Sequence, residues 1–250
     1  MPTRVGEIAA LFRYPVKSMA GESVEAADLG WHGLDGDRRL ALRRLDDRSG
    51  FPWLTASKVP DLLRFVPLRR GALAAHDPPS HVRTPEGEEL PAFGPELAAD
   101  LGRRHGSPVE MAFLNRGIFD EAAVSVVAAA TVESVCGLAG LRPDVRRFRP
   151  NLLLATTRSA PFEEDAWVGG LLTFGDAEDA PAIYVTNRDE RCSMVNLDPD
   201  TALPDPNLLK AVVKARDNKA GVYGAVARRG RLAVGQPVYF RPTSGDGFRG

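Results

Sequence analysis

The sequence predicts a mostly β fold, a β-barrel with a few inserted helices, from three observations. Short apolar segments recur along the chain at 5–12, 39–43, 109–113, 151–155 and 183–185. Some alternate apolar and polar residues, which is typical of strands with one buried face. The 20 prolines and 24 glycines interrupt these segments often, as many short strands require. Strands and helices do not alternate regularly, so we expect a barrel and not a βαβ sheet.

Three segments have the apolar spacing of helices, and they are 95–104, 131–138 and 206–216. The third has the clearest pattern, because Pro206 suits a first helical turn and four apolar residues form a stripe behind it. Cys136 lies on the apolar face of the second segment, so we expect it in the core.

Two further stretches bear on how the chain is organised. Segments 222–226 and 232–240 flank a turn near Gly230, and this arrangement predicts a hairpin. The stretch 74–94 is rich in proline, glycine and acidic residues, so we expect a loop or a seam between two units there. Composition marks no sharper boundary.

Composition excludes several classes of protein. A hydrophobic fraction of 44% and a charged fraction of 26% are ordinary for a globular chain. The net charge of −1 favours neither nucleic acid nor an anionic membrane surface as a partner. Helix 206–216 and the residues after it faintly resemble a helix-turn-helix, but the missing basic excess argues against a nucleic-acid-binding module.

The chain has the features of a cytoplasmic protein. Its amino terminus is polar, and no apolar run approaches the roughly 18–20 residues that span a membrane. Two cysteines do not make a disulfide framework. We therefore expect a reducing compartment, in which both cysteines stay as thiols.

Cys192 is the strongest candidate for chemistry. It follows Arg191, lies close to Arg188, and precedes the turn-forming residues 198–200. A thiolate is a nucleophile and a soft metal ligand, and neighbouring guanidinium groups favour the thiolate. The alternative is a small buried hydrophobic residue, since unpaired cysteines are often buried.

Three other patterns place polar groups on turns or strand edges. Lys17 and Ser18 follow Tyr14-Pro15-Val16 and can offer an ammonium and a hydroxyl to an oxyanion. Arg38 ends a turn rich in glycine and aspartate, and Arg149 and Asn151 precede a buried strand. Surface turns and strand caps are the structural alternatives.

Tyr223 stands in a predicted strand between small residues. A tyrosine in this setting can contact a ligand or lie in the core.

Six motifs occur in a fixed order, and together they resemble one family. They are Tyr-Pro-Val-Lys-Ser at 14–18, Gly-Leu-Asp-Gly-Asp-Arg at 33–38, Phe-Arg-Pro-Asn at 148–151, Phe-Glu-Glu-Asp-Ala-Trp at 162–167, Arg-Cys-Ser-Met-Val-Asn-Leu-Asp-Pro-Asp at 191–200 and Gly-Val-Tyr at 221–223. The chain resembles the MOSC family, named for the carboxyl-terminal domain of molybdenum cofactor sulfurase. It is most similar to the branch with an N-terminal β-barrel domain, which includes the mitochondrial amidoxime reducing component.

The resemblance implies a domain division and a cofactor. We expect an N-terminal MOSC-type β-barrel domain at 1–94 and the MOSC domain at 95–250. The implied cofactor is the molybdenum cofactor, molybdenum bound to molybdopterin, with Cys192 as the metal ligand and catalytic residue.

The implied cofactor-binding residues come from the matched motifs. Lys17, Ser18 and Arg38 match residues that hold the phosphate and pterin end. Arg149 and Asn151 match polar contacts near the pterin.

Two further matches lie beside the expected metal. Arg191 matches the residue next to the metal cysteine, and Tyr223 matches a tyrosine close to the cofactor.

The chain departs from the branch at two places. The stretch 120–124 lacks the Thr-Ser pair that contacts the cofactor in the amidoxime-reducing proteins, and Glu190 stands where relatives often have serine. A carboxylate near an anionic cofactor is unfavourable unless it points away or pairs with Arg188. We expect neither an iron–sulfur cluster nor a pyridoxal-phosphate site in this chain.

The resemblance implies an oxidoreductase that uses the molybdenum cofactor to reduce small N-hydroxylated compounds. Its electrons would come from a separate ferredoxin- or flavin-type reductase. The alternative is a sulfur carrier that holds a persulfide on Cys192, which also needs a reactive thiolate.

Overall fold

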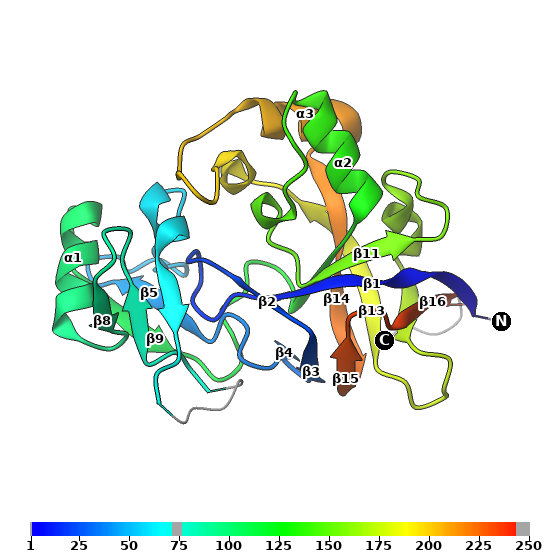
Figure 1. The fold of residues 1–250 in the computed structure, drawn as a ribbon, viewed down its shortest axis with the longest axis horizontal. Coiled ribbons are helices and arrows are strands. Elements are labelled where there is room, and N and C mark those ends of the chain that lie inside the picture. The colour runs from blue at the N-terminus through cyan, green and yellow to red at the C-terminus, as the bar shows by residue number, and fades with distance from the viewer. Residues whose placement is uncertain (1, 72–76, 244–250) are drawn as a thin grey trace.

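The computed structural model describes residues 2–71 and 77–243, which form two bodies of strands (Figure 1). In this view a barrel occupies the right-hand side, with helices α2 (Ala129–Leu138) and α3 (Asn207–Arg216) above it. Smaller sheets and helix α1 (Pro95–His105) lie on the left. The predicted mostly β fold with a barrel is confirmed.

Seven strands close into the barrel. In hydrogen-bonded order they are β11 (Leu152–Thr156), β10 (Val124–Ala128), β14 (Lys219–Arg228), β13 (Ala182–Glu190), β12 (Gly170–Phe174), β16 (Pro237–Pro242) and β1 (Thr3–Arg13). An eighth strand, β2 (Glu22–Val24), pairs with the end of β1. The barrel closes because β1 also pairs with β11, and β2 extends the sheet beyond β1. The first strand of the chain thus shares a sheet with the last.

Apolar side chains fill the barrel. Strand β10 reads Val-Ser-Val-Val-Ala and is buried along its whole length. Gly6 lies where β1 runs against β11, and a Cβ there would stand 2.2 Å from the carbonyl oxygen of Ala155, so this close approach requires glycine. The core includes Ile8, Leu11, Val124, Val126, Leu152, Leu172, Phe174 and Ile183. Each such side chain contributes about 1.5–3 kcal/mol by leaving water.

The left-hand body has its own sheets. Strand β5 (Leu40–Arg44) pairs with β9 (Val109–Phe113). Strands β6 (Val66–Leu68), β7 (His81–Arg83) and β8 (Glu89–Pro91) form a second sheet. Strands β7 and β8 correct the expectation that 74–94 is a loop, although 72–76 lies outside the described residues.

A second apolar core fills this body, and one distant loop contributes to it. Its members include Val16, Leu40, Leu42, Leu54, Leu62, Phe65, Val82, Leu97 and Leu101. Leu197 belongs to the same core, and Met194 packs against it. The loop that carries Cys192 therefore spans from the barrel to the left-hand body.

The predicted hairpin near Gly230 is wrong. Strand β15 (Gly230–Ala233) pairs with β3 (Ala26–Gly30), which also pairs with β4 (Gly33–Leu34). Strand β16 lies between β12 and β1. The reason is that β10 and β13 already occupy both edges of β14, so β14 has no free edge for a hairpin partner.

The three predicted helices are present, with bounds shifted by one or two residues. Helix α1 ends at Gly106, whose φ of 81° is left-handed. Cys136 is fully buried, as predicted. Four short 3-10 helices complete the elements of the described residues, and they are η1 (Pro60–Arg64), η2 (Val145–Arg147), η3 (Glu163–Trp167) and η4 (Ser193–Asn196). Across residues 2–71 and 77–243, no helix has the length and apolar character to cross a membrane.

Candidate functional site

A pocket of about 420 Å³ lies where the barrel meets the left-hand body, and we call it the central pocket. Seven of the eight predicted site residues line it, and they are Lys17, Ser18, Arg38, Arg149, Arg191, Cys192 and Tyr223. They come from the loop after β1, the turn before β5, the segment before β11, the end of β13, and β14. The fold thus joins segments that lie far apart in the sequence.

The loop after β1 carries Lys17 and Ser18. The backbone N–H of Lys17 donates to the carbonyl of Leu40 at 2.7 Å, which fixes the loop against β5. Ser18 has a left-handed φ of 65°, an uncommon conformation for a residue with a Cβ. The Lys17 ammonium donates to Asp120 at 2.7 Å, and its side chain is only 4% exposed. Burial lowers the pKa of Lys17.

Two arginines stack on one tyrosine ring beside this loop. The guanidinium of Arg38 lies 4.7 Å from the centre of the Tyr14 ring, and that of Arg149 lies 4.2 Å from it. Cation–π contacts of this kind hold planar guanidinium groups in a fixed orientation. Both arginines have left-handed φ values, 48° for Arg38 and 50° for Arg149. Two residues that lie side by side in space thus have a strained backbone, which is typical of functional sites.

The two stacked arginines differ in their partners. Arg38 donates to Asp37 at 2.6 Å and to the carbonyl of Arg149 at 3.0 Å. Nη2 of Arg149 is buried and has no hydrogen-bond partner within the described residues. Burial lowers the pKa of Arg149 to about 10, so the group remains charged near neutral pH. Within residues 2–71 and 77–243, the pocket therefore contains a buried cation without an ion-pair partner.

Arg191 faces the interior of the protein. Its guanidinium donates to the carbonyls of Ala220 and Phe148, each at 2.7 Å, and pairs with Asp189 at 2.9 Å. Asp189 also accepts from the hydroxyl of Ser125 at 2.8 Å, and burial raises the pKa of Asp189. Arg191 thus anchors the start of the Cys192 loop to three other elements.

Asn151 is the predicted site residue that the structure places outside the central pocket. Its side chain is 1% exposed. Its oxygen accepts from the backbone N–H of Ser125 at 3.1 Å, and its nitrogen donates to the carbonyl of Phe12 at 3.3 Å. Asn151 therefore joins β10 to β1 behind the pocket wall, and its amide is already engaged there.

The two cysteines occupy opposite environments. Cys192 is exposed, lines the central pocket, and lies directly before η4 in an extended conformation. Cys136 is buried on α2, and burial raises the pKa of its thiol. Only the position of Cys192 suits a ligand or a nucleophile.

Tyr223 lines the pocket from β14, where it stands opposite Ser125 of β10. Burial raises the pKa of Tyr223, so its hydroxyl stays protonated at neutral pH and can donate a hydrogen bond.

Sequence reasoning missed several lining residues. Asp120 and Glu121 enter the pocket from the stretch that lacks the expected hydroxyls, and Ser125 follows one residue after that stretch. The only feature of the sequence that points to these three residues is that they lie in or beside the stretch 120–124. Asp189 carried a signal as well, because it stands in the Cys192 segment among charged residues.

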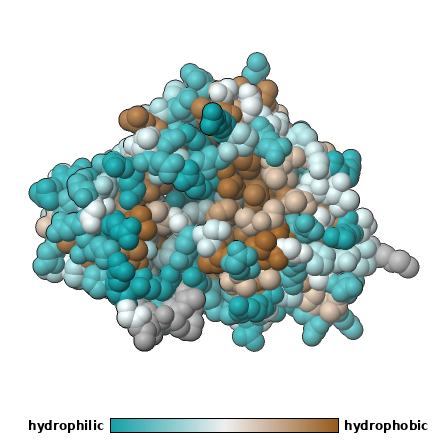
Figure 2. Space-filling view, viewed as in Figure 1, coloured by the Kyte–Doolittle hydropathy of each residue, from teal (hydrophilic) through white to brown (hydrophobic). Residues whose placement is uncertain are grey.

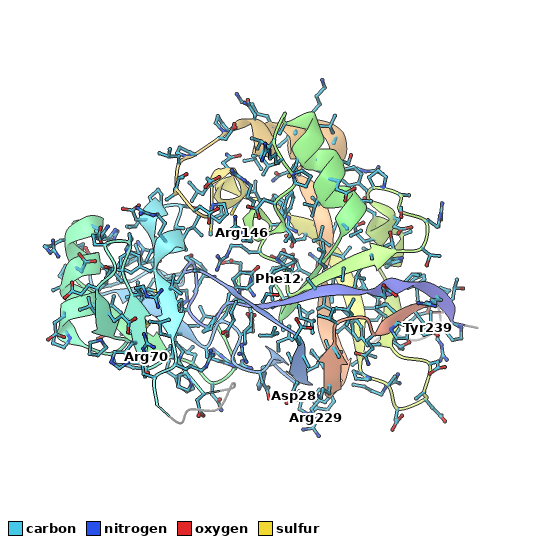
Figure 3. The ribbon with its side chains drawn as sticks, in the orientation of Figure 1. Phe12, Asp28, Arg70, Arg146, Arg229 and Tyr239 are labelled. Atoms are coloured by element: carbon cyan, nitrogen blue, oxygen red, sulfur yellow. The ribbon has the colours of Figure 1, made fainter. Side chains whose placement is uncertain are left out.

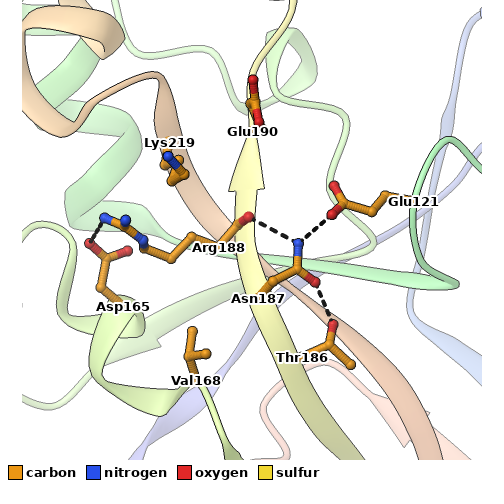
Figure 4. Close-up of a pocket in the computed structure, with 8 residues that line it drawn as sticks. All are labelled: Glu121, Asp165, Val168, Thr186, Asn187, Arg188, Glu190 and Lys219. Carbon is orange, nitrogen blue, oxygen red and sulfur yellow. Dashed lines mark hydrogen bonds and ion pairs between the residues drawn. The ribbon is translucent and has the colours of Figure 1, made fainter.

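A shallow second pocket adjoins the central one, and Figure 4 shows its lining. Glu121 and Glu190 line both pockets. In the shallow pocket Asn187 donates to Glu121 at 2.6 Å, and Arg188 pairs with Asp165 at 3.8 Å. Glu190 accepts a hydrogen bond from Asn218 at 3.4 Å. The ion-pair partner of Arg188 is therefore Asp165 and not Glu190.

Comparison with known families identifies both parts of the chain. The MOSC domain profile matches residues 102–239, and the profile of the MOSC N-terminal beta barrel domain matches residues 5–96. No curated protein matches the chain.

One solved structure shares the fold. The chain is 13% identical to the YuaD protein of Bacillus subtilis, over 98% of this chain and 100% of that one, with a TM-score of 0.53. YiiM from Geobacillus stearothermophilus is 21% identical over 48% of this chain and 54% of that one, with a TM-score of 0.37. At these identities the likeness to YuaD concerns the fold alone. Because the MOSC domain profile covers more than half of the chain and the N-terminal profile covers most of the rest, the chain belongs to the MOSC family.

Proposed function

We propose that this protein binds the molybdenum cofactor through Cys192 and reduces N-hydroxylated compounds with electrons from a separate protein. The MOSC family is related to the C-terminal domain of molybdenum cofactor sulfurase, which supports a role linked to that cofactor. The observation that carries the finer proposal is one pocket that holds both the exposed thiol of Cys192 and the unpaired guanidinium of Arg149.

The residues of the central pocket fit an anionic cofactor with a soft metal. A buried unpaired cation is costly unless an anion neutralises it, and Nη2 of Arg149 is free to bind one. A thiolate is a suitable additional ligand for a metal that already carries two dithiolene sulfurs. The volume of about 420 Å³ lies within the usual range of small-molecule sites.

Each residue then has a role in holding the group. Arg149 and Arg38 would bind its phosphate, because planar guanidinium groups match phosphate oxygens. Lys17 and Ser18 would donate to the same end, and Tyr223 would donate through its protonated hydroxyl. When bound, the cofactor supplies the metal that exchanges electrons with the substrate.

The proposed reaction balances with two electrons and two protons. An N–OH group takes up both, the N–O bond breaks, and the products are an N–H group and water. The electrons would come from a ferredoxin- or flavin-type reductase on another chain. We place the protein in the cytoplasm, where reducing conditions keep Cys192 as a thiol.

Molybdenum content is the first test. The full chain and its Cys192→Ala and Cys136→Ala variants are produced in a host that accumulates the non-nucleotide form of the cofactor, and metal per chain is measured by mass spectrometry. We expect near-stoichiometric molybdenum in the unchanged chain and in Cys136→Ala, and at least a tenfold loss in Cys192→Ala. Full molybdenum and full reductase activity without the Cys192 thiol would contradict the proposal.

The exposure of Cys192 also favours a second candidate, a sulfur carrier. In this reaction the thiolate of Cys192 takes a sulfur atom from the persulfide of a cysteine desulfurase, whose own cysteine leaves as a thiolate. The test is mass spectrometry of the metal-free chain after incubation with a desulfurase and cysteine. A gain of one sulfur atom on Cys192 would support this function, and an unreactive thiol would exclude it.

A further inference from the structure

A third cavity, of about 460 Å³, lies on the other side of Arg149, and we call it the Tyr14 cavity. Its lining comes from both bodies: Phe12 and Arg146 belong to the barrel side, and Leu63 and Val66 belong to the left-hand body. Figure 3 places Phe12 and Arg146 in the middle of the molecule, and Figure 2 shows apolar surface in this central region. Arg149 lines both this cavity and the central pocket.

Tyr14 supplies an unused polar group to this cavity. Its side chain is 2% exposed, and its hydroxyl has no hydrogen-bond partner anywhere in the described chain. Tyr14 lines the Tyr14 cavity but is absent from the lining of the central pocket. Burial raises its pKa to about 12, so the hydroxyl keeps its proton. A buried, unsatisfied donor of this kind costs free energy unless a ligand accepts from it.

The charges around the cavity favour an anion. Arg146 is already paired with two carboxylates, Asp144 at 2.8 Å and Asp200 at 2.7 Å, and Asp200 also lines the cavity. This pair therefore adds no free positive charge. Arg64 pairs with Asp61 only at 3.7 Å, and Arg149 has its unpaired nitrogen. Two weakly paired guanidinium groups therefore line a cavity together with the hydroxyls of Tyr14 and Thr84, which have no hydrogen-bond partner among the described residues.

The rest of the lining is largely apolar, with Leu63, Val66 and Pro85 on one side. We propose that the Tyr14 cavity binds a small organic anion, a carboxylate with an aromatic or branched aliphatic body. Its carboxylate accepts from the Tyr14 hydroxyl and from Arg64 and Arg149, and its apolar body packs against Leu63 and Val66. This site shares Arg149 with the central pocket, but it needs neither molybdenum nor Cys192, so it does not depend on the proposed function.

Titration calorimetry of the full chain with 2-naphthoate tests the proposal, with 2-naphthamide as the uncharged counterpart. We expect one site, with the acid binding at least tenfold more tightly than the amide. Arg64→Ala and Tyr14→Phe should each weaken 2-naphthoate binding by about tenfold, as loss of a hydrogen bond to a charged group predicts. Arg103→Ala is the matched control, because Arg103 also pairs with a carboxylate three residues away.

Lys17→Ala separates the two cavities, because Lys17 lines the central pocket and not the Tyr14 cavity. We expect its affinity for 2-naphthoate to stay unchanged. The proposal is overturned if the acid does not bind, if acid and amide bind equally, or if Lys17→Ala weakens binding while Arg64→Ala does not. If Tyr14→Phe does not fold, Arg64→Ala and the amide decide the outcome.

Discussion

Two clusters of buried charge contribute to the walls of the central pocket, and they differ in how fully they are paired. In the first, Arg191 uses its guanidinium on two backbone carbonyls and on Asp189, which also accepts from Ser125. In the second, Arg38 and Arg149 stack on Tyr14, and one guanidinium nitrogen and the phenol hydroxyl are buried without partners. Nη2 of Arg191 and Oδ1 of Asp189 also have no hydrogen-bond partner among the described residues, so the two clusters differ in charge pairing. Arg191 has a carboxylate partner, whereas no ion pair involves Arg149 in the described part of the chain.

This difference indicates that one cluster supports the structure and the other binds a ligand. Buried charges that are ion-paired inside a protein hold elements in place, and removing one partner leaves an uncompensated charge. Unpaired buried groups cost stability in the free protein and are retained where a ligand satisfies them. We therefore assign the Arg191 cluster to positioning the Cys192 loop and the Tyr14 cluster to binding anions.

The largest expected effect comes from breaking the ion pair between Arg191 and Asp189. Asp189→Asn keeps the shape of the side chain but leaves the Arg191 charge buried, so we expect the free energy of unfolding to fall by about 3–5 kcal/mol. Chemical denaturation measures it. The control is Asp28→Asn, which breaks the exposed pair with Arg231 and should cost less than about 1 kcal/mol. Equal losses in the two variants would remove the distinction.

A smaller effect is expected in the cluster of Arg38 and Arg149 around Tyr14. Arg149→Leu removes an unpaired buried charge, so we expect the free energy of unfolding to stay unchanged or to rise by up to about 2 kcal/mol. Arg38→Leu should instead destabilise, because it removes the ion-pair partner of the fully buried Asp37. Both variants should lose molybdenum if the proposed function holds. A strongly destabilised Arg149→Leu would show that this arginine is structural.

The smallest effect concerns pH and extends the comparison to a buried carboxylate. Glu164 is fully buried, accepts from Ala128 and Thr131, and burial raises its pKa above the ordinary 4.5. The folded state therefore holds this proton more tightly than the unfolded state. The resulting stabilisation is complete below pH 4.5 and is lost as pH rises through the folded pKa.

Glu164→Gln should remove this part of the pH dependence. The measurement is denaturant unfolding of both proteins at several pH values upward from 4.5, with the difference between them taken at each pH. We expect the stability of the unchanged chain to decline relative to the variant. A constant difference across the range would mean that the pKa of Glu164 is not raised.

The sequence identified the parts of the site that carry unusual local patterns. Lys17, Arg38 and Cys192 each stand in a motif that departs from ordinary strand or helix periodicity, and the structure brings them into one pocket. Asn151 stands in such a motif too, but its amide bonds to two barrel strands. Its motif marked a constrained position without showing which way the side chain points.

Other features had no local signal. In the sequence Tyr14 belongs to the same motif as Lys17. Its stacking with two arginines depends on Arg149, which lies far along the chain. The failure of the predicted hairpin at Gly230 has the same origin, because the edges of β14 are taken by strands from elsewhere. Local patterns do not report which distant strands compete for an edge.

By itself the sequence determined the β-rich class, the three helices, the burial of Cys136 and the set of motifs, because periodicity and turn chemistry act between neighbouring residues. Only the tertiary structure decided which charges are paired. It turned Arg191 toward Asp189 and divided the space around Arg149 into two cavities. It also left Nη2 of Arg149 without a hydrogen-bond partner among the described residues. Pairing and cavities arise where separate elements meet, and closure of the barrel fixes that meeting.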